Sequence, residues 1–494
     1  MSQINVSNLS FYYDGSYEAI FDQVSFQIDT DWKLGLVGRN GRGKTTFLNL
    51  LMKKYEYTGS ITSAVEFEYF PFAIENMEKT GIEILEEIDP LYEFWRVCRE
   101  MNLLELEAEV LYRPFSTLSN GERTKIMLSV LFAKENAFLL IDEPTNHLDT
   151  QGRESVMQYL KKKKGFILVS HDRNFLDGCV DHILAINKTD IDIIQGNFTS
   201  WWNQKKMRDE SEYAEDKKLR REIGKMTETA AQVGKWSEAG EKSKFDNRIA
   251  GLRPDRGYLG HKAAKVMKRS KIAEKRAMSA VEEKKKLLKN IESEERLKLF
   301  PMSHHKEVLV SAEGVGLSYG EEPVFENISF ELRQGTCTAL EGINGCGKSS
   351  MLKLILGQMP PSNGKLELAS NLVISYVPQD TSFLKGSLDE RIANCNVDER
   401  LFKALLRKLD FPRSHFEKKL EDYSDGQKKK VLLAGSLCQS AHLYIWDEPL
   451  NFIDVFSRIQ LEDLIKEFRP TILLVEHDKR FLSEVGAASI QMLN

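Results

Sequence analysis

Two short segments of this sequence carry the residue types and the spacing that bind phosphate groups. Residues 38–45 (GRNGRGKT) and 342–349 (GINGCGKS) both fit G-x-x-x-x-G-K-[ST], and each follows an apolar run and opens a helix-like stretch. Glycines let backbone N–H groups close around phosphate oxygens, Lys44 and Lys348 reach the β and γ phosphates, and the next hydroxyl can hold Mg²⁺. The two segments predict two sites for a nucleoside triphosphate.

An apolar run that ends in two acids comes after each phosphate-binding segment. The runs read AFLLI and LYIW, and they end in Asp142 and Glu143 in the first half and in Asp447 and Glu448 in the second. Such runs are typical of buried parallel strands, where two carboxylates are costly unless something binds them. We expect the aspartates to orient Mg²⁺ and its waters, and the glutamates to position or deprotonate an attacking water.

Two further features accompany the acids in each half. A later strand ends in His171 or His477, placed to sense or stabilise a γ phosphate. A pentapeptide before the acids, LSNGE or YSDGQ, precedes a helical pattern and can present a hydroxyl and N–H groups to an anion. By itself such a pentapeptide is more often a helix N-cap than a site, but its position before the acid pair favours a site here. Its serines and glycines are Ser119, Gly121, Ser424 and Gly426.

The chain repeats itself. Corresponding residues are 304 positions apart at the phosphate-binding glycines, 305 at the pentapeptide serines and at the aspartates, and 306 at the histidines. Such constancy indicates a duplicated domain of about 200 residues. The predicted fold class is α/β, with two tandem P-loop ATPase domains joined by a long α-helical hairpin linker. We expect the domains at 1–198 and 304–494 and the linker at 199–303.

Composition excludes several classes of protein. The 494 residues are 41% hydrophobic and 29% charged, which fits neither a disordered nor a fibrous chain. No apolar run approaches the 18 residues of a membrane span, and no secretion signal opens the chain, so we expect a cytoplasmic protein without a membrane partner. The six cysteines form no C-x-x-C pair, and we read them as reduced thiols.

The linker differs from the rest of the chain in charge. Residues 201–300 hold 27 Lys or Arg and 17 Asp or Glu, although the whole chain has a net charge of −5. Apolar positions at helical spacing predict one helix over 204–233 and a second over 266–291, packed as an antiparallel hairpin about 45 Å long. Glycines between them place the tip at about 234–260.

Cations and aromatic rings are interleaved around this tip. Residues 235–271 hold 11 basic and 4 acidic residues. Cations for phosphates and planar rings for unstacked bases suit irregular RNA, whereas the alternative is a solvated coiled coil with a disordered tip. The residues that we expect to contact RNA are Trp236, Lys242, Lys244, Phe245, Arg248, Arg253, Arg256 and Tyr258.

Together these motifs resemble those of ABC-type ATPase domains. The segments are similar to Walker A, signature, Walker B, D-loop and switch-histidine motifs, and the likeness covers about 390 residues. Two such domains with a charged helical linker resemble the ABC-F translation proteins, and DEPTNHLD (142–149) and QGNF (195–198) carry that likeness. Within that subfamily, the chain resembles the Lsa-type antibiotic-resistance proteins.

The resemblance implies two composite ATP sites, each built from the Walker motifs of one copy and the signature of the other. ATP and Mg²⁺ are then the cofactors, with Glu143, Glu448, His171 and His477 as the catalytic residues and Thr45, Asp142, Ser349, Gln379 and Asp447 at the metal. Nucleotide-binding residues are Tyr13, Gly38, Asn40, Gly41, Gly43, Lys44, Thr45, Thr46, Asp142, Ser424 and Gly426 in site one, and Tyr319, Gly342, Asn344, Gly345, Gly347, Lys348, Ser349, Ser350, Gln379, Asp447, Ser119 and Gly121 in site two.

The resemblance also implies a partner. An ABC-F protein of this kind is expected to act as a monomer, to enter the E site of the 70S ribosome with ATP bound, and to push its linker tip toward the P-site tRNA and the 23S rRNA of the peptidyl-transferase centre. Lincosamides, pleuromutilins or streptogramin A would then be released, without DNA or membrane involvement. A housekeeping ABC-F translation factor is the alternative, and the ATPase subunit of a transporter is a third.

The Q-loop position of the first copy departs from the family pattern, and the role of two tyrosines stays open. Gln379 fits the Q-loop position of the second copy, but the first copy has Phe72, which cannot coordinate a metal. Site one therefore hydrolyses more slowly, or water replaces the side chain. Tyr13 and Tyr319 precede their Walker glycines by 25 and 23 residues, and either stack on adenine or pack in a core.

Overall fold

The computed structural model describes residues 2–13, 19–90, 92–146, 148–187, 191–242, 297–320, 322–343, 345–395, 397–412 and 415–492, with helical positions between 261 and 280. By its contacts the chain divides into two units, Ser200–Ser293 and the combination of Met1–Thr199 with Glu294–Asn494. Both sequence repeats fall in one unit because they contact each other. Where the three predicted domains begin and end stays a prediction.

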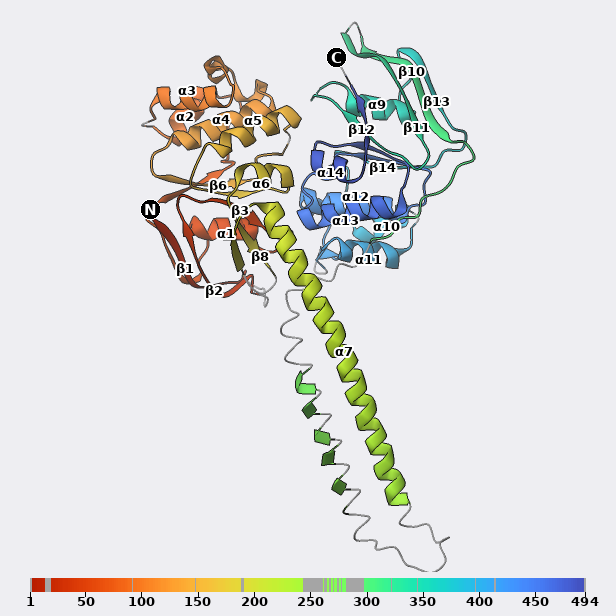
Figure 1. Cartoon of the computed structure of the whole chain (residues 1–494). Helices are drawn as coiled ribbons and strands as arrows, with labels where there is room; N and C mark the ends of the chain where they lie inside the picture. Colours follow the sequence, from red (N-terminus) through yellow and green to blue (C-terminus); the bar gives the residue numbers. More distant parts are fainter. Residues whose placement is uncertain are drawn as a thin grey trace, which may run out of the picture. The chain divides into compact units, whose positions relative to one another are not determined.

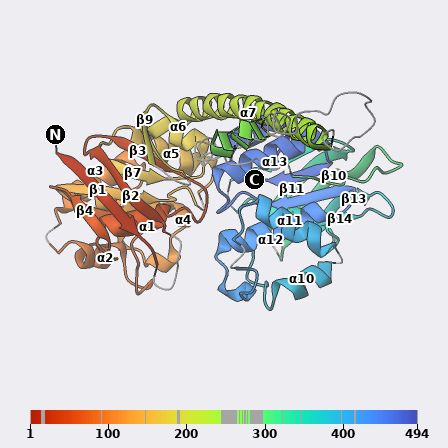
Figure 2. The same ribbon diagram turned by 90° about the horizontal axis from the view of Figure 1, so that it is seen from below.

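The first copy combines a three-stranded antiparallel sheet with a six-stranded sheet. β1 lies between β2 and β4 (Figure 2). The larger sheet has the order β5-β6-β7-β3-β8-β9 and is parallel except for β9. The strands are β1 (Gln3–Phe11), β2 (Phe21–Asp29), β3 (Lys33–Val37), β4 (Thr58–Thr62), β5 (Glu66–Phe70), β6 (Ala137–Asp142), β7 (Phe166–Val169), β8 (His182–Ile186) and β9 (Ile191–Gln195).

The second copy repeats this plan. Its antiparallel sheet has the order β11-β10-β13, and its parallel sheet has the order β14-β15-β16-β12-β17, which matches β5-β6-β7-β3-β8 strand for strand. The predicted α/β class and the duplication are therefore confirmed. The strands are β10 (Val308–Tyr319), β11 (Glu322–Arg333), β12 (Cys337–Glu341), β13 (Asn363–Leu368), β14 (Ile374–Val377), β15 (Leu443–Asp447), β16 (Ile472–Val475) and β17 (Ala488–Gln491).

Helices cover these sheets in both copies (Figure 1). The first copy has α1 (Lys44–Leu51), α2 (Gly81–Ile88), α3 (Phe94–Leu103), α4 (Asn120–Ala133), α5 (Thr150–Lys161) and α6 (Arg173–Cys179), with short 3₁₀ turns at Ala108–Tyr112 and Phe115–Thr117. The second has α9 (Lys348–Ile355), α10 (Leu388–Cys395), α11 (Glu399–Lys408), α12 (Asp425–Cys438), α13 (Val455–Phe468) and α14 (Lys479–Glu484), with a 3₁₀ turn at Leu420–Asp422.

The register of the parallel sheets brings the polar residues to one edge. In the first copy Asp142 pairs with Val169 and Leu36 pairs with the same Val169, so β3, β6 and β7 end side by side. All four residues of β7 and of β16 are buried, as expected for continuous apolar runs covered on both faces. The phosphate-binding loop follows β3, Asp142 is the last residue of β6, and His171 comes two residues after β7, so these groups meet at the carboxyl edge of the sheet.

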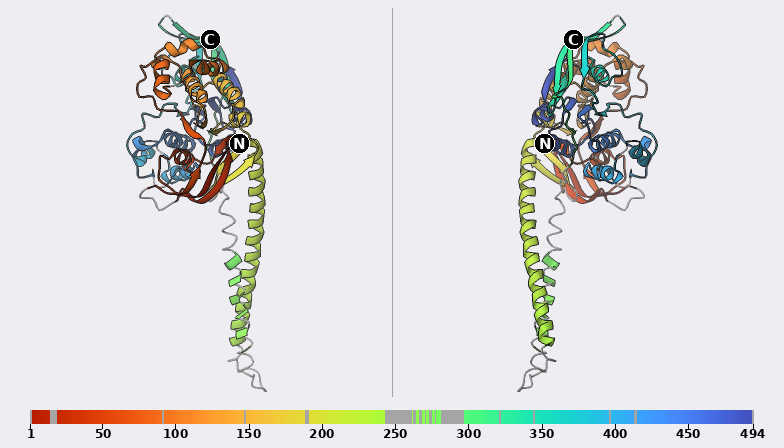
Figure 3. Two further views of the ribbon diagram at one scale, coloured as in Figure 1. Left: turned by 90° about the vertical axis from the view of Figure 1, so that its left-hand side faces the viewer. Right: turned by 90° about the vertical axis from the view of Figure 1, so that its right-hand side faces the viewer.

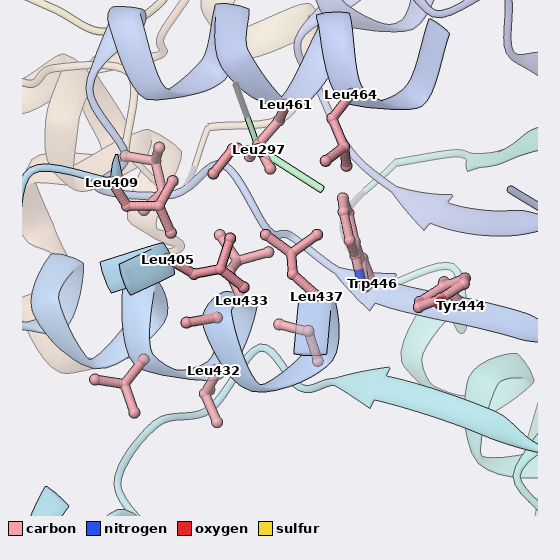
Figure 4. Close-up of a cluster of buried hydrophobic side chains, with 14 of the residues drawn as sticks. Leu297, Leu405, Leu409, Leu432, Leu433, Leu437, Tyr444, Trp446, Leu461 and Leu464 are labelled. Atoms are coloured by element: carbon pink, nitrogen blue, oxygen red, sulfur yellow. The ribbon is translucent and has the colours of Figure 1, made fainter. Parts of the chain in front are cut away.

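The core of the second copy includes residues that precede its first strand. Leu297 is 3% exposed and packs in one cluster with leucines of α11, α12 and α13 and with Trp446 of β15 (Figure 4). The indole N–H of Trp446 donates to Oγ of Ser436 at 2.9 Å, which satisfies the one polar group of that ring. Residues just before 304 thus contribute to the second copy because their apolar side chains complete its core.

The first linker helix is longer than the sequence predicted. α7 spans Phe198–Lys242, 45 residues or about 68 Å at 1.5 Å per residue, and it runs uninterrupted (Figure 3). Its predicted end near residue 233 is wrong, because Gly234 and Gly240 both lie inside the helix. A glycine costs a helix about 1 kcal/mol, which does not stop a helix of this length. The predicted tip therefore cannot begin before residue 243. Among the described helices, none is long and apolar enough to span a membrane.

Candidate active sites

Each phosphate-binding loop turns at a glycine that other residue types would not fit. Gly43 and Gly347 have φ of 91° and 92°, in the left-handed region, directly before α1 and α9. A Cβ at Gly43 would lie 2.5 Å from Cγ2 of Ile20, and one at Gly347 would lie 2.6 Å from Cδ1 of Phe325. Both backbone geometry and space therefore require glycine here.

The two loop lysines fold back over their own loops. Lys44 donates from Nζ to the carbonyl oxygen of Gly38 at 2.7 Å, and Lys348 donates to that of Gly342 at 2.8 Å. Both lysines are 8% exposed. Burial lowers the pKa of Lys44, against the opposing charges of Asp454, Glu143 and Asp142. Because a carbonyl is a weaker partner than a phosphate oxygen, a bound triphosphate can replace these contacts.

In site one, two hydroxyl groups converge on Asp142. Tyr69 donates to Oδ2 at 2.9 Å and Thr45 donates to the same oxygen at 3.3 Å. Burial raises the pKa of Asp142, and burial together with this carboxylate raises the pKa of Tyr69. Sequence reasoning missed Tyr69, although it stands three positions before Phe72 in a strand that ends at the same sheet edge.

Glu143 and His171 lie together beside the loop of site one. Nε2 of His171 is 3.5 Å from Oε1 of Glu143, and the backbone N–H of Glu143 donates to the carbonyl of Val169 at 2.9 Å. Burial, followed by the charge of Asp142, raises the pKa of Glu143 to about 8, and burial lowers the pKa of His171 well below its usual value. Glu143 has φ of 51°, a left-handed backbone conformation that residues other than glycine rarely adopt.

Site two holds its glutamate differently. Glu448 has φ of 46°, and its Oε2 accepts from Gln379 at 2.8 Å and from Asn451 at 2.5 Å. Burial, followed by the neighbouring Glu448, raises the pKa of Asp447 to about 6. Burial, followed by the charge of Lys348, lowers the pKa of His477 to about 4.

Several buried polar atoms at these sites lack a hydrogen-bond partner among the described residues. They are Oε1 of Glu143, Oδ1 of Asp447 and Nε2 of His477. Unsatisfied buried carboxylate oxygens next to a hydroxyl and a loop of backbone N–H groups are a donor set that suits Mg²⁺ and a polyphosphate. The residues present therefore fit ATP with magnesium.

Each site opens into a cavity of the size that nucleotides require. The cavity of site one has a volume of about 530 Å³ and that of site two about 510 Å³. Site one is lined by both copies: Tyr13, Asn40, Gly41, Gly43, Lys44, Thr45, Thr46, Asp142, Glu143 and His171 come from the first, and Ser424, Asp425, Gly426, Gln427, Lys430 and Phe452 from the second.

The cavity of site two also has walls from both copies, but they differ from the prediction. Tyr319, Gly345, Gly347, Lys348, Ser349, Ser350, Gln379, Glu448, Asn451 and His477 come from the second copy, and Asn120, Leu148 and Arg153 come from the first. Of the first signature motif, Asn120 lines the cavity, whereas Ser119 and Gly121 are not among its lining residues. Asp447 is 2% exposed and is not among the lining residues.

Some predicted residues lie elsewhere or outside the described part of the chain. Gly38 and Gly342 act through their carbonyls, as acceptors for the loop lysines. Asn344 lies outside the described residues, as do the tip positions Lys244, Phe245, Arg248, Arg253, Arg256 and Tyr258. Trp236 and Lys242 belong to α7, where only their backbone is described.

The signature serines are helix N-caps. Ser119 accepts from the backbone N–H of Glu122 at the start of α4, and Ser424 accepts from that of Gln427 at the start of α12, each in a capping box. The N-cap interpretation is thus correct for both. It is compatible with a second task in site one, where Ser424 also lines the cavity.

The two tyrosines are on the surface beside their loops rather than in a core. Tyr13 is 41% exposed and its hydroxyl is 2.7 Å from Oγ1 of Thr46, and Tyr319 is 54% exposed with its hydroxyl 3.4 Å from Oγ of Ser350. Neither ring is buried in a core, although the ring of Tyr13 lies 5.0 Å from that of the buried Phe11, and stacking on adenine stays a prediction. Phe72, by contrast, packs against the apolar cluster of α2, α3 and α4.

The loop of site one is tied directly to the other copy. The amide of Asn40 donates to the backbone carbonyl of Phe452 at 3.0 Å. Arg39 pairs with Asp410 at 2.7 Å, and its guanidinium lies 5.1 Å from the ring centroid of Phe456. The residue that corresponds to Arg39 in the second loop is Ile343, which is 53% exposed. The two loops therefore differ in how they engage the opposing copy.

This fold and the two cavities beside its phosphate-binding loops define a tandem P-loop ATPase. The family model described as ABC transporter matches residues 21–146 and 325–451. The chain therefore belongs to the ABC transporter family, in which it is an ATP-hydrolysing ABC-F protein that resembles the Lsa-type proteins, as the sequence motifs predicted.

Individual relatives match over nearly the whole chain. The ribosome protection protein VmlR of Bacillus subtilis is 26% identical over 503 residues, which cover 99% of this chain and 87% of the relative. The energy-dependent translational throttle protein EttA of Haemophilus influenzae is 24% identical, covering 94% and 88%. A crystal structure of the archaeal ribosome recycling factor aABCE1 with the stalk protein aP1 shares the fold, with a TM-score of 0.61, 18% identity and coverage of 97% and 86%.

The ion pair between the copies leads to a charge-reversal prediction. Arg39→Glu should weaken nucleotide binding at site one about tenfold, because it places two carboxylates together at a mostly buried contact. The double variant with Asp410→Arg should recover most of that loss. Binding of a fluorescent ATP analogue measures both effects, and Ile343→Glu in the other loop is the matched control. A double variant that binds no better than Arg39→Glu alone would refute the pairing.

The raised pKa of Glu143 leads to a prediction about pH. Between its ordinary value of 4.5 and about 8, the folded state binds more protons at this group than the unfolded state does, so the group lowers the stability of the free protein as pH rises. Glu143→Gln should therefore raise the thermal unfolding temperature over wild type by an amount that grows from pH 5 to pH 8. The exposed Glu154→Gln is the control, and a gain independent of pH would contradict the buried, unpaired carboxyl.

Proposed function

We propose that this chain is an ATP-dependent ribosome-binding protein of the cytoplasm that enters the E site of the 70S ribosome and protects the peptidyl-transferase centre. Its linker would approach the 23S rRNA and the P-site tRNA and so release lincosamides, pleuromutilins or streptogramin A. Either displacement of the tRNA or reshaping of the rRNA would achieve this. The chain would act as a monomer, since both halves of each site are in one chain.

One observation carries this proposal. The likeness to the ribosome protection protein covers 99% of the chain, so it includes residues 200–293 and not only the two ATPase copies. A 45-residue helix leaves the first copy, and the segment after it is basic. A long helix followed by a cationic segment suits contact with RNA inside a larger particle.

The two cavities support control of ribosome binding by ATP. In site one, Lys44 and the loop N–H groups approach a triphosphate from the first copy, and the start of α12 approaches from the second. A γ phosphate bound from both sides stabilises contact between the copies, and its loss removes that contact. ATP binding would thus hold the closed form, and hydrolysis would time its release.

The chain's own carboxylates would activate the water. Glu143 and Glu448 each come directly after the last strand residue, in a left-handed conformation that turns the side chain into the site. Each would orient the water and take its proton, while His171 and His477 would contact the γ phosphate. Mg²⁺, held by Thr45 and Asp142 in site one and by Ser349, Gln379 and Asp447 in site two, would neutralise phosphate charge.

A second function is favoured by a separate observation. The translational throttle protein EttA matches 94% of this chain at 24% identity, close to the value for the ribosome protection protein. A housekeeping factor that regulates the state of the ribosome and its tRNA would use every ATPase residue described above. The two functions differ in drug tolerance and in the linker tip rather than in the ATP sites.

Blocking hydrolysis tests the ribosome as partner. Glu143→Gln with Glu448→Gln should hold the chain on 70S ribosomes in the presence of ATP, because closure persists while water activation is lost. Sucrose-gradient sedimentation measures this, with Lys44→Ala plus Lys348→Ala as the control that cannot bind ATP. If the Glu→Gln double variant stays at the top of the gradient with ATP, ribosome binding is refuted.

A drug panel tests protection itself. Cells that express the intact chain should tolerate lincosamides, pleuromutilins or streptogramin A better than cells without it, and unrelated drugs should show no difference. Deletion of residues 240–258 should keep ATP turnover within about twofold and abolish the tolerance, since the deletion leaves both cavities intact. Unchanged tolerance in the presence of the intact chain, with altered translation, would favour the housekeeping function.

A further inference from the structure

A buried lysine lies beneath site two. Lys429 of α12 is 2% exposed, and its Nζ donates to the carbonyl oxygens of Pro378 and Asp447, each at 2.9 Å. Burying an ammonium group is costly unless its N–H groups are bonded. A lysine buried there despite that cost, with two such specific acceptors, is expected to do more than fill space.

The two carbonyls are those directly before the polar residues of site two. Pro378 precedes Gln379, and Asp447 precedes Glu448; Gln379 in turn donates to Oε2 of Glu448 at 2.8 Å. Lys429 therefore anchors the backbone on both sides of this side-chain pair. Movement of the ammonium would displace the two backbone segments that orient Gln379 and Glu448.

The same helix reaches the other site. Ser424 and Gly426, at the start of α12, line the cavity of site one, and Lys429 lies little more than one turn further along. An α-helix transmits a shift along its axis because its turns are hydrogen-bonded to one another. A displacement of the α12 start by nucleotide in site one is thus passed to the anchor of Gln379 and Glu448.

Within its described residues, the first copy has no equivalent of this anchor. At the position of Lys429 it has Thr124, and at the position of Gln379 it has Phe72, which packs into an apolar cluster. Its aspartate is bonded instead by Tyr69. A connection of this kind therefore runs from site one to site two, and these residues provide no counterpart in the opposite direction.

We propose that Lys429 is a positioning residue that holds Gln379 and Glu448 for hydrolysis in site two and makes their alignment depend on nucleotide in site one. Burial lowers the pKa of Lys429 to about 8, and the negative charges of Asp447, Glu448 and Glu476 oppose this shift. The coupling is mechanical: it passes through α12 and two carbonyl hydrogen bonds.

The test measures turnover of site two alone, in the full chain with Glu143→Gln, so that site one binds ATP without hydrolysing it. Lys429→Met should lower kcat about tenfold to a hundredfold and change KM by less than about threefold. Lys429→Thr, which introduces the residue type found at this position in the first copy, should have the same effect. The neighbouring Lys428→Met is the matched control and should leave kcat within about twofold.

A second readout separates positioning from a general loss of structure. With Lys429 present, kcat of site two should fall when site one cannot bind ATP, as in Lys44→Ala, relative to the Glu143→Gln chain. The quantity compared is the ratio of the site-two kcat in the Glu143→Gln chain to that in the Lys44→Ala chain. In the Lys429 variants this ratio should approach one. If Lys429 were needed only for packing, its replacement would lower both kcat values and leave their ratio unchanged. An unchanged ratio, or an unchanged kcat in Lys429→Thr at a normal unfolding temperature, would overturn the proposal.

Discussion

The structure depends on one requirement of phosphate binding. A P-loop supplies N–H groups and a cation from one side of the γ phosphate only. The N-terminus of another helix must therefore bind the other side. In site one that helix start is α12 of the second copy, and Asn40 and Arg39 tie the loop to the same copy. A single copy cannot close its own site. Duplication of the domain is therefore a physical condition for the activity.

Charged side chains, some of them buried, contribute to the contact between the copies. Arg173 pairs with Glu462, both 5% exposed, and Arg480 donates to Asp177 at 3.0 Å. Within the second copy, Arg458 also pairs with Asp478 at 3.0 Å and Lys430 with Asp454 at 3.1 Å. Buried ion pairs contribute less net stability than apolar packing of the same size. Such an interface suits two copies that must close and separate in each cycle, which a hydrophobic interface would resist.

The two sites are duplicated but not equivalent. Site one has a tyrosine on its aspartate, a phenylalanine at the Q-loop position and an arginine that crosses to the other copy. Site two has a glutamine on its glutamate and a buried lysine beneath it. The tyrosine and the glutamine each bond a carboxylate that would handle magnesium or water. The duplicated fold thus carries two sites that can differ in rate without any difference in overall architecture.

The sequence alone determined the parts that depend on local chemistry. Gly43, Lys44, Asp142 and their counterparts were identifiable because a P-loop needs glycine, lysine and hydroxyl at set spacing and because buried strands are continuously apolar. For Ser119 and Ser424 the N-cap was the alternative to a binding role, because each serine stands directly before a helical pattern. The length of α7 was underestimated, since a glycine signals a break locally whereas the cost of about 1 kcal/mol is small for a long helix.

Only the tertiary structure decided which distant residues meet. Tyr69 reaches Asp142 across 73 positions, and Arg39 reaches Asp410 across 371. Lys429 stands in a run of three lysines, and nothing in that run distinguishes the one that points inward to two carbonyls. Spacing reports periodic structure and local turns, but a contact between elements depends on how sheets and helices pack. That packing is a property of the whole fold and cannot be predicted from any single segment.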